Sequence, residues 1–321
     1  GGKRLLRITV PAFVLEREVE LPAFPWVTAL SAEGLCALLL VNGQHEIWIF
    51  DEASLAVKRR IPVPGGMTLS TAPTIRKAWV STAANAKIPG VTSVDLAKGS
   101  IVRTVTAEDL AARWPGAKRT RSGTRSLFTP HPVGLFTFTA MSPDGAFLFG
   151  SFGNFIARFR VKGFDLVPEE LGLVLGLGVE CKRRRAKGQK ARRIEMTADG
   201  TLVTLGRSNM RDLTRESFFT SPFTYWFKAT DLKTPVLTLE VPRRDGRACS
   251  VDIPARRAYL ADDRGRIHVT DLYGKEVALF SHPDGLKTTG QWLRFLVHPE
   301  GGKVLAITEK GVYWIEFTDK E

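Results

Sequence analysis

Short apolar runs recur along the whole chain, and a tight polar turn separates each run from the next. Runs of about four to eight residues with alternating apolar positions predict β-strands rather than helices. Asp, Ser, Thr, Pro and Gly at the turns favour chain reversal, because they hydrogen-bond locally or permit the required backbone angles. The recurring turns are Ser31–Gly34, Ser142–Gly145, Thr197–Gly200, Pro254–Arg257 and His298–Gly301.

A second recurring signal is an apolar strand that ends in aspartate, at Asp51, Asp95, Asp231 and Asp271. We interpret these aspartates as structural residues that fix the following turn. The two signals together define a strand–turn–strand–turn unit of about 40–45 residues, which is typical of a β-propeller. The 321 residues are enough for six or seven such units at about 40–50 residues each. The sequence therefore predicts an all-β fold in a single domain that spans residues 1–321.

Three segments resemble the WD40/YVTN-like propeller repeats: the Ser-Pro-Asp-Gly turn at Ser142–Gly145 and the strands Glu46–Asp51 and Ile267–Leu272. The resemblance extends over nearly the whole chain and concerns the fold, not an activity. The Gly-His and Trp-Asp dipeptides of full WD40 repeats are absent. The resemblance implies blades of four antiparallel strands, called a to d from the central channel outward.

With this template the sequence predicts six blades, with seven as the alternative. The last blade lacks an outer strand, and an N-terminal strand from Leu5–Val10 or Val14–Leu21 is expected to fill this place and close the ring. The expected strands are Trp26–Leu30, Cys36–Val41, Glu46–Phe50 and Ala56–Val63; Met67 to Thr106 with Val91–Leu96 and Ile101–Thr106; Thr137–Met141, Phe147–Ser151, Phe155–Val161 and one within Leu171–Val179; Arg193–Met196, Leu202–Leu205, Thr224–Ala229 and Val236–Val241; Cys249–Ile253, Ala258–Ala261, Arg266–Thr270 and Glu276–Phe280; Trp292–Val297, Lys303–Thr308 and Val312–Phe317.

Four connections are longer than the others. Two join strands b and c, and two join strand d to the next blade; in an antiparallel blade these connections leave from the same side. We therefore expect all four on one face, where loops commonly carry function. A short helix is expected at Ala107–Trp114, because Glu108 and Asp109 suit a first turn and Arg113 a last turn. The four segments are Ala83–Gly90, Ala107–Phe136, Glu180–Arg192 and Arg207–Phe223.

The net charge of +13 is unevenly distributed. Residues 101–193 carry 17 Lys/Arg against 7 Asp/Glu, whereas residues 194–321 carry 18 of each. A concentrated basic region favours an anionic partner, since each neutralised phosphate releases counterions. Two clusters lie in the long connections: Lys118, Arg119, Arg121 and Arg125, and Lys182, Arg183, Arg184, Arg185, Lys187, Lys190, Arg192 and Arg193. The alternative is that these are solvated loops that bind nothing in particular.

The connection Arg207–Phe223 adds aromatic residues to cations. Phe218 and Phe219 lie near Arg211 and Arg215, a combination that stacks and holds single-stranded nucleic acids. The alternative is that the rings anchor a long loop to the blades or form a protein-binding patch.

Enzyme signatures are weak. The turn at Ser142 places its glycine one residue too early for the Asp-box of sialidase-like propellers, and neither a nucleophile elbow nor a dinucleotide fingerprint is complete. The five histidines do not fall at metal-ligand spacing, and the pair Asp262 and Asp263 is interpreted as turn chemistry. We therefore predict no catalytic residues, no metal and no cofactor.

The leading hypothesis is a non-catalytic interaction scaffold whose basic face docks a nucleic acid or an acidic protein surface. The alternative is a metal-dependent hydrolase or lyase of the lactonase type that uses the central channel. A small-molecule substrate is not expected. Membrane association is not expected either, because the longest apolar run, Leu171–Val179, is far shorter than a membrane span. Three scattered cysteines and no apolar leader predict a cytoplasmic setting.

Overall fold

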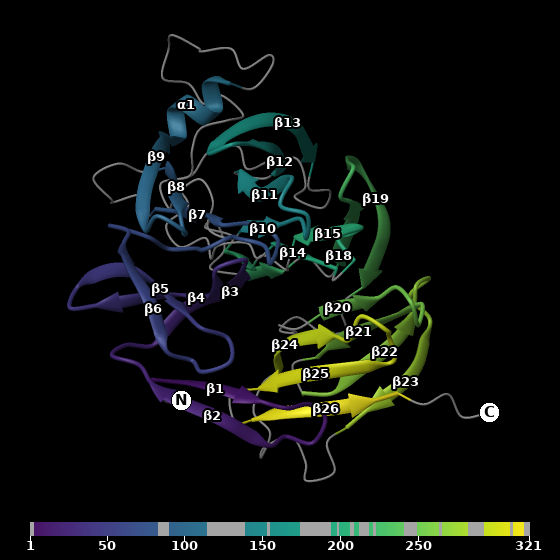
Figure 1. Cartoon of the computed structure of the whole chain (residues 1–321). Helices are drawn as coiled ribbons and strands as arrows, with labels where there is room; N and C mark the ends of the chain where they lie inside the picture. Colours follow the sequence, from purple (N-terminus) through teal and green to yellow (C-terminus); the bar gives the residue numbers. More distant parts are fainter. Residues whose placement is uncertain are drawn as a thin grey trace. The chain divides into compact units, whose positions relative to one another are not determined.

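The computed structural model describes residues 3–82, 90–113, 139–152, 155–173, 194–197, 199–205, 209–211, 218–220, 223–240, 249–262, 265–281, 292–308 and 311–317. The described part is almost entirely antiparallel β-sheet, with one short helix (Figure 1). Contacts group the chain into two compact units, Gly1–Leu173 and Val174–Glu321, and each unit is considered by itself.

The first unit contains a hairpin followed by three sheets whose strands pair in chain order (Figure 1). The hairpin is β1 (Arg4–Ile8) and β2 (Leu15–Glu20). The sheets are β3 (Pro25–Ser31), β4 (Gly34–Val41), β5 (Gln44–Phe50) and β6 (Val57–Pro62); β7 (Lys77–Ser81), β8 (Gly90–Asp95) and β9 (Ser100–Thr106); and β10 (Thr139–Met141), β11 (Phe147–Phe152), β12 (Phe155–Lys162) and β13 (Asp165–Leu173). The helix α1 (Ala107–Ala112) follows β9 directly.

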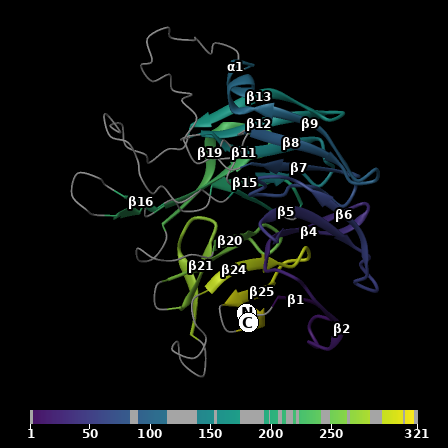
Figure 2. The same ribbon diagram turned by 90° about the vertical axis from the view of Figure 1, so that its left-hand side faces the viewer.

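The second unit contains three further sheets and a separate hairpin. Two sheets have four strands and the last has three among the described residues. The sheets are β14 (Ile194–Met196), β15 (Leu202–Leu205), β18 (Phe223–Lys228) and β19 (Asp231–Glu240); β20 (Cys249–Asp252), β21 (Arg257–Ala261), β22 (Ile267–Asp271) and β23 (Glu276–Phe280); and β24 (Trp292–Val297), β25 (Lys303–Thr308) and β26 (Val312–Glu316). The hairpin pairs β16 (Asn209–Arg211) with β17 (Phe218–Thr220), and β16 is visible in Figure 2.

Each of the four aspartates accepts a hydrogen bond at Oδ1 from a backbone N–H two or three residues later, at 2.9 Å. For Asp51, Asp95 and Asp271 this bond lies in the turn between the third and fourth strands, as predicted, whereas Asp231 is the first residue of β19 and follows that turn. The pairs are Asp51 with Ser54, Asp95 with Lys98, Asp231 with Lys233 and Asp271 with Tyr273. The prediction that these aspartates are structural is confirmed.

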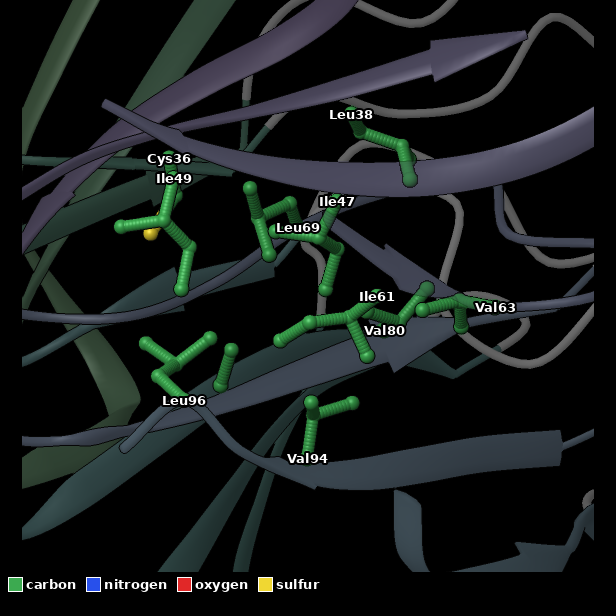
Figure 3. Close-up of a cluster of buried hydrophobic side chains, with 11 residues drawn as sticks. Cys36, Leu38, Ile47, Ile49, Ile61, Val63, Leu69, Val80, Val94 and Leu96 are labelled. Atoms are coloured by element: carbon green, nitrogen blue, oxygen red, sulfur yellow. The ribbon is translucent and has the colours of Figure 1, made fainter. Parts of the chain in front are cut away.

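The β3–β6 sheet is buried on both faces, which explains why β4 is apolar almost throughout. Alternate residues point to opposite faces of a strand. Cys36 and Leu38 therefore pack with Ile47 and Ile49 against the β7–β9 sheet, in a cluster that includes Val80 (Figure 3). The thiol of Cys36 is fully buried, and this desolvation raises its pKa to about 11.

The opposite face of the β3–β6 sheet is covered by the N-terminal segment. Ala37 and Leu39 pack there with Trp48, Phe50 and Leu21, the residue that follows β2. The guanidinium of Arg7 in β1 donates hydrogen bonds of 3.1 Å to the backbone carbonyls of Glu52 and Ala53. The β1–β2 hairpin is thus fixed to the first sheet on the face that the second sheet leaves open.

Clusters of the same kind lie between the other neighbouring sheets within each unit. Trp79 and Val91 pack with Leu148 and Phe159, which joins the β7–β9 and β10–β13 sheets. In the second unit, Tyr259 and Val269 pack with residues of β24–β26, and Trp226 packs with residues of β20 and β21. Face-to-face packing of successive twisted sheets is the arrangement that a propeller requires.

Four expectations need correction. The fourth strand of the β14–β19 sheet begins at Asp231 instead of Val236, because the chain reverses directly after Lys228, which is paired with Asp231. The fourth strand of the third sheet is Asp165–Leu173 and does not lie within 171–179, because β12 reverses at once through Gly163, whose φ of 62° suits a tight turn. The connection 207–223 contains the β16–β17 hairpin instead of loop alone. In the second sheet the innermost strand is reduced to two isolated bridges, Gly66 with Thr82 and Ser70 with Trp79.

The predicted helix is confirmed, but it ends at Ala112 and its last turn holds no basic residue. Arg113 lies just beyond the helix and makes tertiary contacts instead, as described below.

Candidate functional site

Most of the predicted anion-binding residues lie outside the described residues. For three of them the structure describes the backbone: Arg211 in β16, and Phe218 and Phe219 in β17. The residues that lie outside are Lys118, Arg119, Arg121, Arg125, Lys182, Arg183, Arg184, Arg185, Lys187, Lys190, Arg192, Arg193 and Arg215.

The β16–β17 hairpin brings part of the predicted set together. Arg211 is paired in register with Phe218, and Met210 with Phe219. Residues directly opposite each other in an antiparallel pair have Cβ atoms about 4.5–5.5 Å apart. Strand pairing therefore places a cation position next to an aromatic position, as the sequence suggested.

The long connections leave each sheet from one edge, which we call the insertion edge. It is the edge where the second strand ends, the third begins and the fourth ends. In the β7–β9 sheet, Gly90 at the start of β8 is paired with Thr106 at the end of β9. In the β14–β19 sheet, Leu205 at the end of β15 is paired with Ile194 at the start of β14. A common face formed by the insertion edges of different sheets stays a prediction.

The base of the first connection is closed by Thr82 and Gly90. The backbone N–H of Gly90 donates to Oγ1 of Thr82 at 2.8 Å, and the N–H of Thr82 donates to the carbonyl of Gly90 at 2.9 Å. A side chain at residue 90 has no space, since its Cβ would lie 2.1 Å from the carbonyl oxygen of Val105. The two ends of segment 83–89 are therefore held together tightly.

The base of the second connection is anchored by α1. Oγ1 of Thr106 accepts a hydrogen bond from the N–H of Asp109 at 3.1 Å, which caps the first turn. Leu110 is fully buried in the cluster that contains Trp79 and Phe159. The helix thus fixes the point from which the chain departs at residue 114, and both views show it at the end of β9 (Figures 1 and 2).

Asp165 forms a second anchor at this place. Its Oδ1 lies 2.8 Å from Nη1 of Arg113, and its Oδ2 lies 3.2 Å from Nη1 of Arg103 in β9. Arg113 also donates to the carbonyl of Leu166 at 3.0 Å. Burial alone would raise the pKa of Asp165, but the hydrogen bonds from Arg113 and the backbone of Leu166 and the two positive charges outweigh it and lower the pKa.

Charge is divided unevenly between the described residues and the rest of the chain. The described residues contain 24 Lys/Arg and 24 Asp/Glu, whereas the remaining residues contain 22 and 9. The whole net charge of +13 therefore belongs to segments outside the described residues. Sequence segments that flank the insertion edges supply most of it.

An exposed aromatic patch, which sequence reasoning missed, lies at the insertion edge of the β3–β6 sheet. Phe24 is 62% exposed and Trp26 is 46% exposed. The ring of Trp26 meets the ring of His45 edge-on, with centroids 5.5 Å apart. Desolvation lowers the pKa of His45, which favours its neutral form. The only sequence signal was the Phe-Pro-Trp run at residues 24–26, which also suits an ordinary strand start.

A polar network occupies the same edge of the β20–β23 sheet. Oδ2 of the buried Asp262 lies 2.7 Å from Nη2 of Arg266 and 3.3 Å from Nε2 of His268. Nδ1 of His268 lies 2.5 Å from Oε2 of Glu276. Burial would raise the pKa of Asp262, but hydrogen bonds from Arg266 and His268 outweigh this and lower it. The predicted turn role is confirmed for Asp262, because its Oδ1 also accepts the N–H of Arg266 at 2.9 Å. Asp263, the other residue of the predicted pair, lies outside the described residues.

In the part of the chain that the structure describes, no three His, Cys, Asp or Glu side chains gather in a way that could hold a metal ion. A nucleophile beside His268 is also not found among the contacts of the described residues. The contacts of Asp262 join the turn after β21 to β22, and the contact of His268 with Glu276 joins β22 to β23. No helix among the described residues is long and apolar enough to span a membrane.

Comparison with known proteins gives the fold and no family. No family model matches the chain, and no curated protein matches it. Among solved structures, the chain is similar to hydrazine synthase from Kuenenia stuttgartiensis, with a TM-score of 0.64 and 13% identity over 98% of this chain and 89% of that chain. It is also similar to a chain in a crystal structure of a mitotic checkpoint complex, with a TM-score of 0.60 and 11% identity over 99% of this chain and 82% of that chain. The predicted resemblance to β-propellers is confirmed at the level of the fold.

Proposed function

We propose that the protein is a non-catalytic interaction scaffold that docks an anionic partner, a nucleic acid or an acidic protein surface, on its basic connections. The observation that carries the proposal is the division of charge: the described residues are neutral overall, and the segments outside them, chiefly the four long connections, hold the entire net charge of +13. A charge that served solubility alone would have no reason to be confined to the connections. Concentrated positive charge attracts and holds polyanions.

We also propose that the six sheets are the six blades of a ring closed by the N-terminal hairpin. In a propeller each blade is covered by a neighbour on both faces. The β1–β2 hairpin covers the face of the first sheet on which the last blade belongs, with Leu21 in the shared core and Arg7 bonded to the Glu52 carbonyl. Among the described residues the β24–β26 sheet has three strands, and the proposal assigns its fourth place to the hairpin. Closure would complete it and remove an open edge.

A closed ring would bring the insertion edges of all sheets to one face. The basic clusters at residues 118–125 and 182–193 would then form one surface, together with the Arg211–Phe218 pair. Partners that contact several blades at once gain affinity and orientation from a rigid support, so this arrangement suits a scaffold better than a flexible tail would.

A charge-reversal experiment tests the proposal. We expect the variant with Arg183, Arg184, Arg185, Lys187 and Lys190 replaced by Glu to lose binding to heparin and to oligonucleotides. The matched control replaces five exposed lysines on the opposite edges of the sheets by Glu, which changes the net charge equally: Lys58, Lys98, Lys162, Lys233 and Lys275. The control should retain most of the binding, because its substitutions lie away from the proposed surface.

Filter binding at two salt concentrations provides the measurement. For the wild type, the logarithm of affinity should fall with the logarithm of salt by about 0.7–0.9 per phosphate contacted. Both variants should melt near the wild-type temperature, since surface substitutions usually change stability by less than about 0.5 kcal/mol each. Equal loss in the two variants would show a general charge effect, and absence of binding by the wild type would refute the proposal.

A further inference from the structure

The outer strand of the β20–β23 sheet, β23, is unpaired along one side. The strand order is β20, β21, β22 and β23, so β23 pairs with β22 alone among the described strands (Figure 1). The first four of its five residues are exposed, and Val277 and Leu279 are 53% and 45% exposed. A free edge of this kind presents a row of unpaired backbone N–H and C=O groups, which is a template for one more strand.

Four other outer strands carry the charged residues and prolines that discourage pairing with another chain. These residues are Lys58 and Pro62 in β6, Arg103 in β9, Pro168 and Glu169 in β13, and Lys233 and Pro235 in β19. In contrast, β23 contains no cation and no proline. Its one charged residue is Glu276, whose Oε2 lies 2.5 Å from Nδ1 of His268, and the nearest cation, Lys275, precedes the strand.

The sequence of β23 suits antiparallel pairing with a second copy of itself. When the pair is centred on Ala278, all five residues of the strand find a partner, whereas a centre at Val277 or Leu279 leaves two of them unpaired. Val277 then lies opposite Leu279 of the second copy, and Glu276 lies opposite Phe280. Apolar side chains therefore meet on one face, and like charges, which destabilise a cross-strand pair, do not face each other.

We infer that the protein forms a symmetric dimer through β23, in which the β20–β23 sheets of two copies join into one continuous sheet with the two-fold axis at Ala278. Two-fold contacts of this self-complementary type are the commonest way in which identical chains associate. Two five-residue strands share only a small surface, so the dimer should be weak and should depend on concentration. The inference is independent of the proposed anionic partner.

Charge substitutions at Ala278 test both the strand and its register. Ala278→Lys and Ala278→Asp each place like charges opposite each other at the axis of a homodimer, whereas a mixture of the two variants places opposite charges there. Ala278 is exposed, so both variants should fold like wild type. The control is Val236→Lys, which adds the same charge to another outer strand, β19, at a residue that is 49% exposed.

Sedimentation equilibrium of each protein is measured from about 1 µM to about 1 mM, the range of dissociation constants expected of a small contact. Wild type and Val236→Lys should change from monomer to dimer within this range. Ala278→Lys alone and Ala278→Asp alone should stay monomeric, because like charges directly opposite each other repel. The equimolar mixture of these two variants should form dimers again.

Hydrogen exchange of wild type at low and high protein concentration shows where the contact lies. The backbone amides of β23 should exchange more slowly at high concentration, because pairing with the second copy protects them. The amides of β19 should exchange at the same rate in both samples. Far-UV circular dichroism and melting curves of the three variants establish that they are folded.

Three results would overturn the inference. Wild type that stays monomeric up to about 1 mM would show that the edge of β23 does not bind a second copy. Dimers of Ala278→Lys alone would place the contact elsewhere on the molecule. A mixture of Ala278→Lys and Ala278→Asp that stays monomeric would exclude pairing centred on Ala278. These results leave the proposed anionic-partner function standing, since the charge-reversal variants test it separately.

Discussion

At the scale of single residues, Asp165 has the clearest predicted effect on stability. Its folded pKa is lowered by Arg113 and Arg103, so the interaction stabilises the fold at a pH above the unfolded value of about 3.9 and is lost as the pH falls through the lower folded value. At pH 7, Asp165→Asn should lower the free energy of unfolding by about 0.5–1 kcal/mol, because the carboxylate is partly exposed.

Urea unfolding of Asp165→Asn and wild type at pH 7 and pH 3 measures this effect. The difference between them should shrink at pH 3, where the wild-type carboxylate begins to protonate. Glu52→Gln is the control, since Glu52 is an exposed acid without an ion pair among the described residues. A difference that is the same at both pH values would show that the side chain acts through packing instead of charge.

Gly90 and Gly43 are glycines for two different reasons: Gly90 lacks space for a side chain, and Gly43 has a positive φ. Gly90→Ala should destabilise the protein by about 1–3 kcal/mol, because the new Cβ would lie 2.1 Å from the Val105 carbonyl oxygen and the strands must shift. Gly43 has open space and a φ of 80°, so Gly43→Asn should change stability by less than about 1 kcal/mol. Thermal melting of both variants measures the two changes in stability. An equal loss of stability in Gly90→Ala and Gly43→Asn would contradict the steric argument for Gly90.

At the scale of elements, the contribution of α1 to stability should come mainly from the core contact of Leu110. Leu110 is fully buried between two sheets, so Leu110→Ala should cost about 2–5 kcal/mol. Thr106→Ala, which removes the cap, should cost about 0.5–2 kcal/mol. Ile101→Ala on the neighbouring strand is the control, since Ile101 is 42% exposed. Denaturant unfolding gives the loss in free energy of unfolding for each of the three variants. A larger loss for Ile101→Ala than for Leu110→Ala would refute the anchoring role of α1.

Strand prediction succeeded where local chemistry decides the structure. Turns such as Ser142–Gly145 hold themselves together, with the N–H of Phe147 donating to Oγ of Ser142 at 2.8 Å, so their positions can be read from the sequence. β13 was misplaced because the apolar run after residue 171 looked more strand-like than Asp165–Glu170. The acids of that segment form ion pairs with Arg103, Arg113, Arg158 and Arg160, which belong to other parts of the chain.

The candidate site was predictable only in part, for a related reason. The basic clusters could be found by counting charges, and the connections by their length. The aromatic patch could not, because whether Trp26 is buried or exposed depends on a one-residue register shift against β4. Likewise, the pairing of Arg211 with Phe218 required knowing that 209–220 folds back as a hairpin.

At the scale of the whole molecule, charge and packing divide the chain into two kinds of segment. The sheets bury their apolar faces against one another, and the described residues, turns included, hold 24 basic and 24 acidic residues. The segments outside the described residues carry the surplus of positive charge. None of the charge-reversal substitutions falls in a described apolar cluster, so both variants should remain folded.

The proposed closure of the ring predicts how fast the backbone of β26 exchanges its amide hydrogens. If the β1–β2 hairpin completes the β24–β26 sheet, the backbone N–H groups on the free side of β26 are hydrogen-bonded in the full chain and exposed to water without the hairpin. Removing residues 1–20 should therefore speed hydrogen exchange in Val312–Glu316, measured by mass spectrometry. Exchange in β23, the outer strand of the preceding sheet, is the internal control and should not change. A synthetic peptide of residues 3–21 should restore protection of β26 when added to the truncated chain. Equal exchange of β26 in both proteins would leave the hairpin as a cover for the first sheet alone and would refute closure.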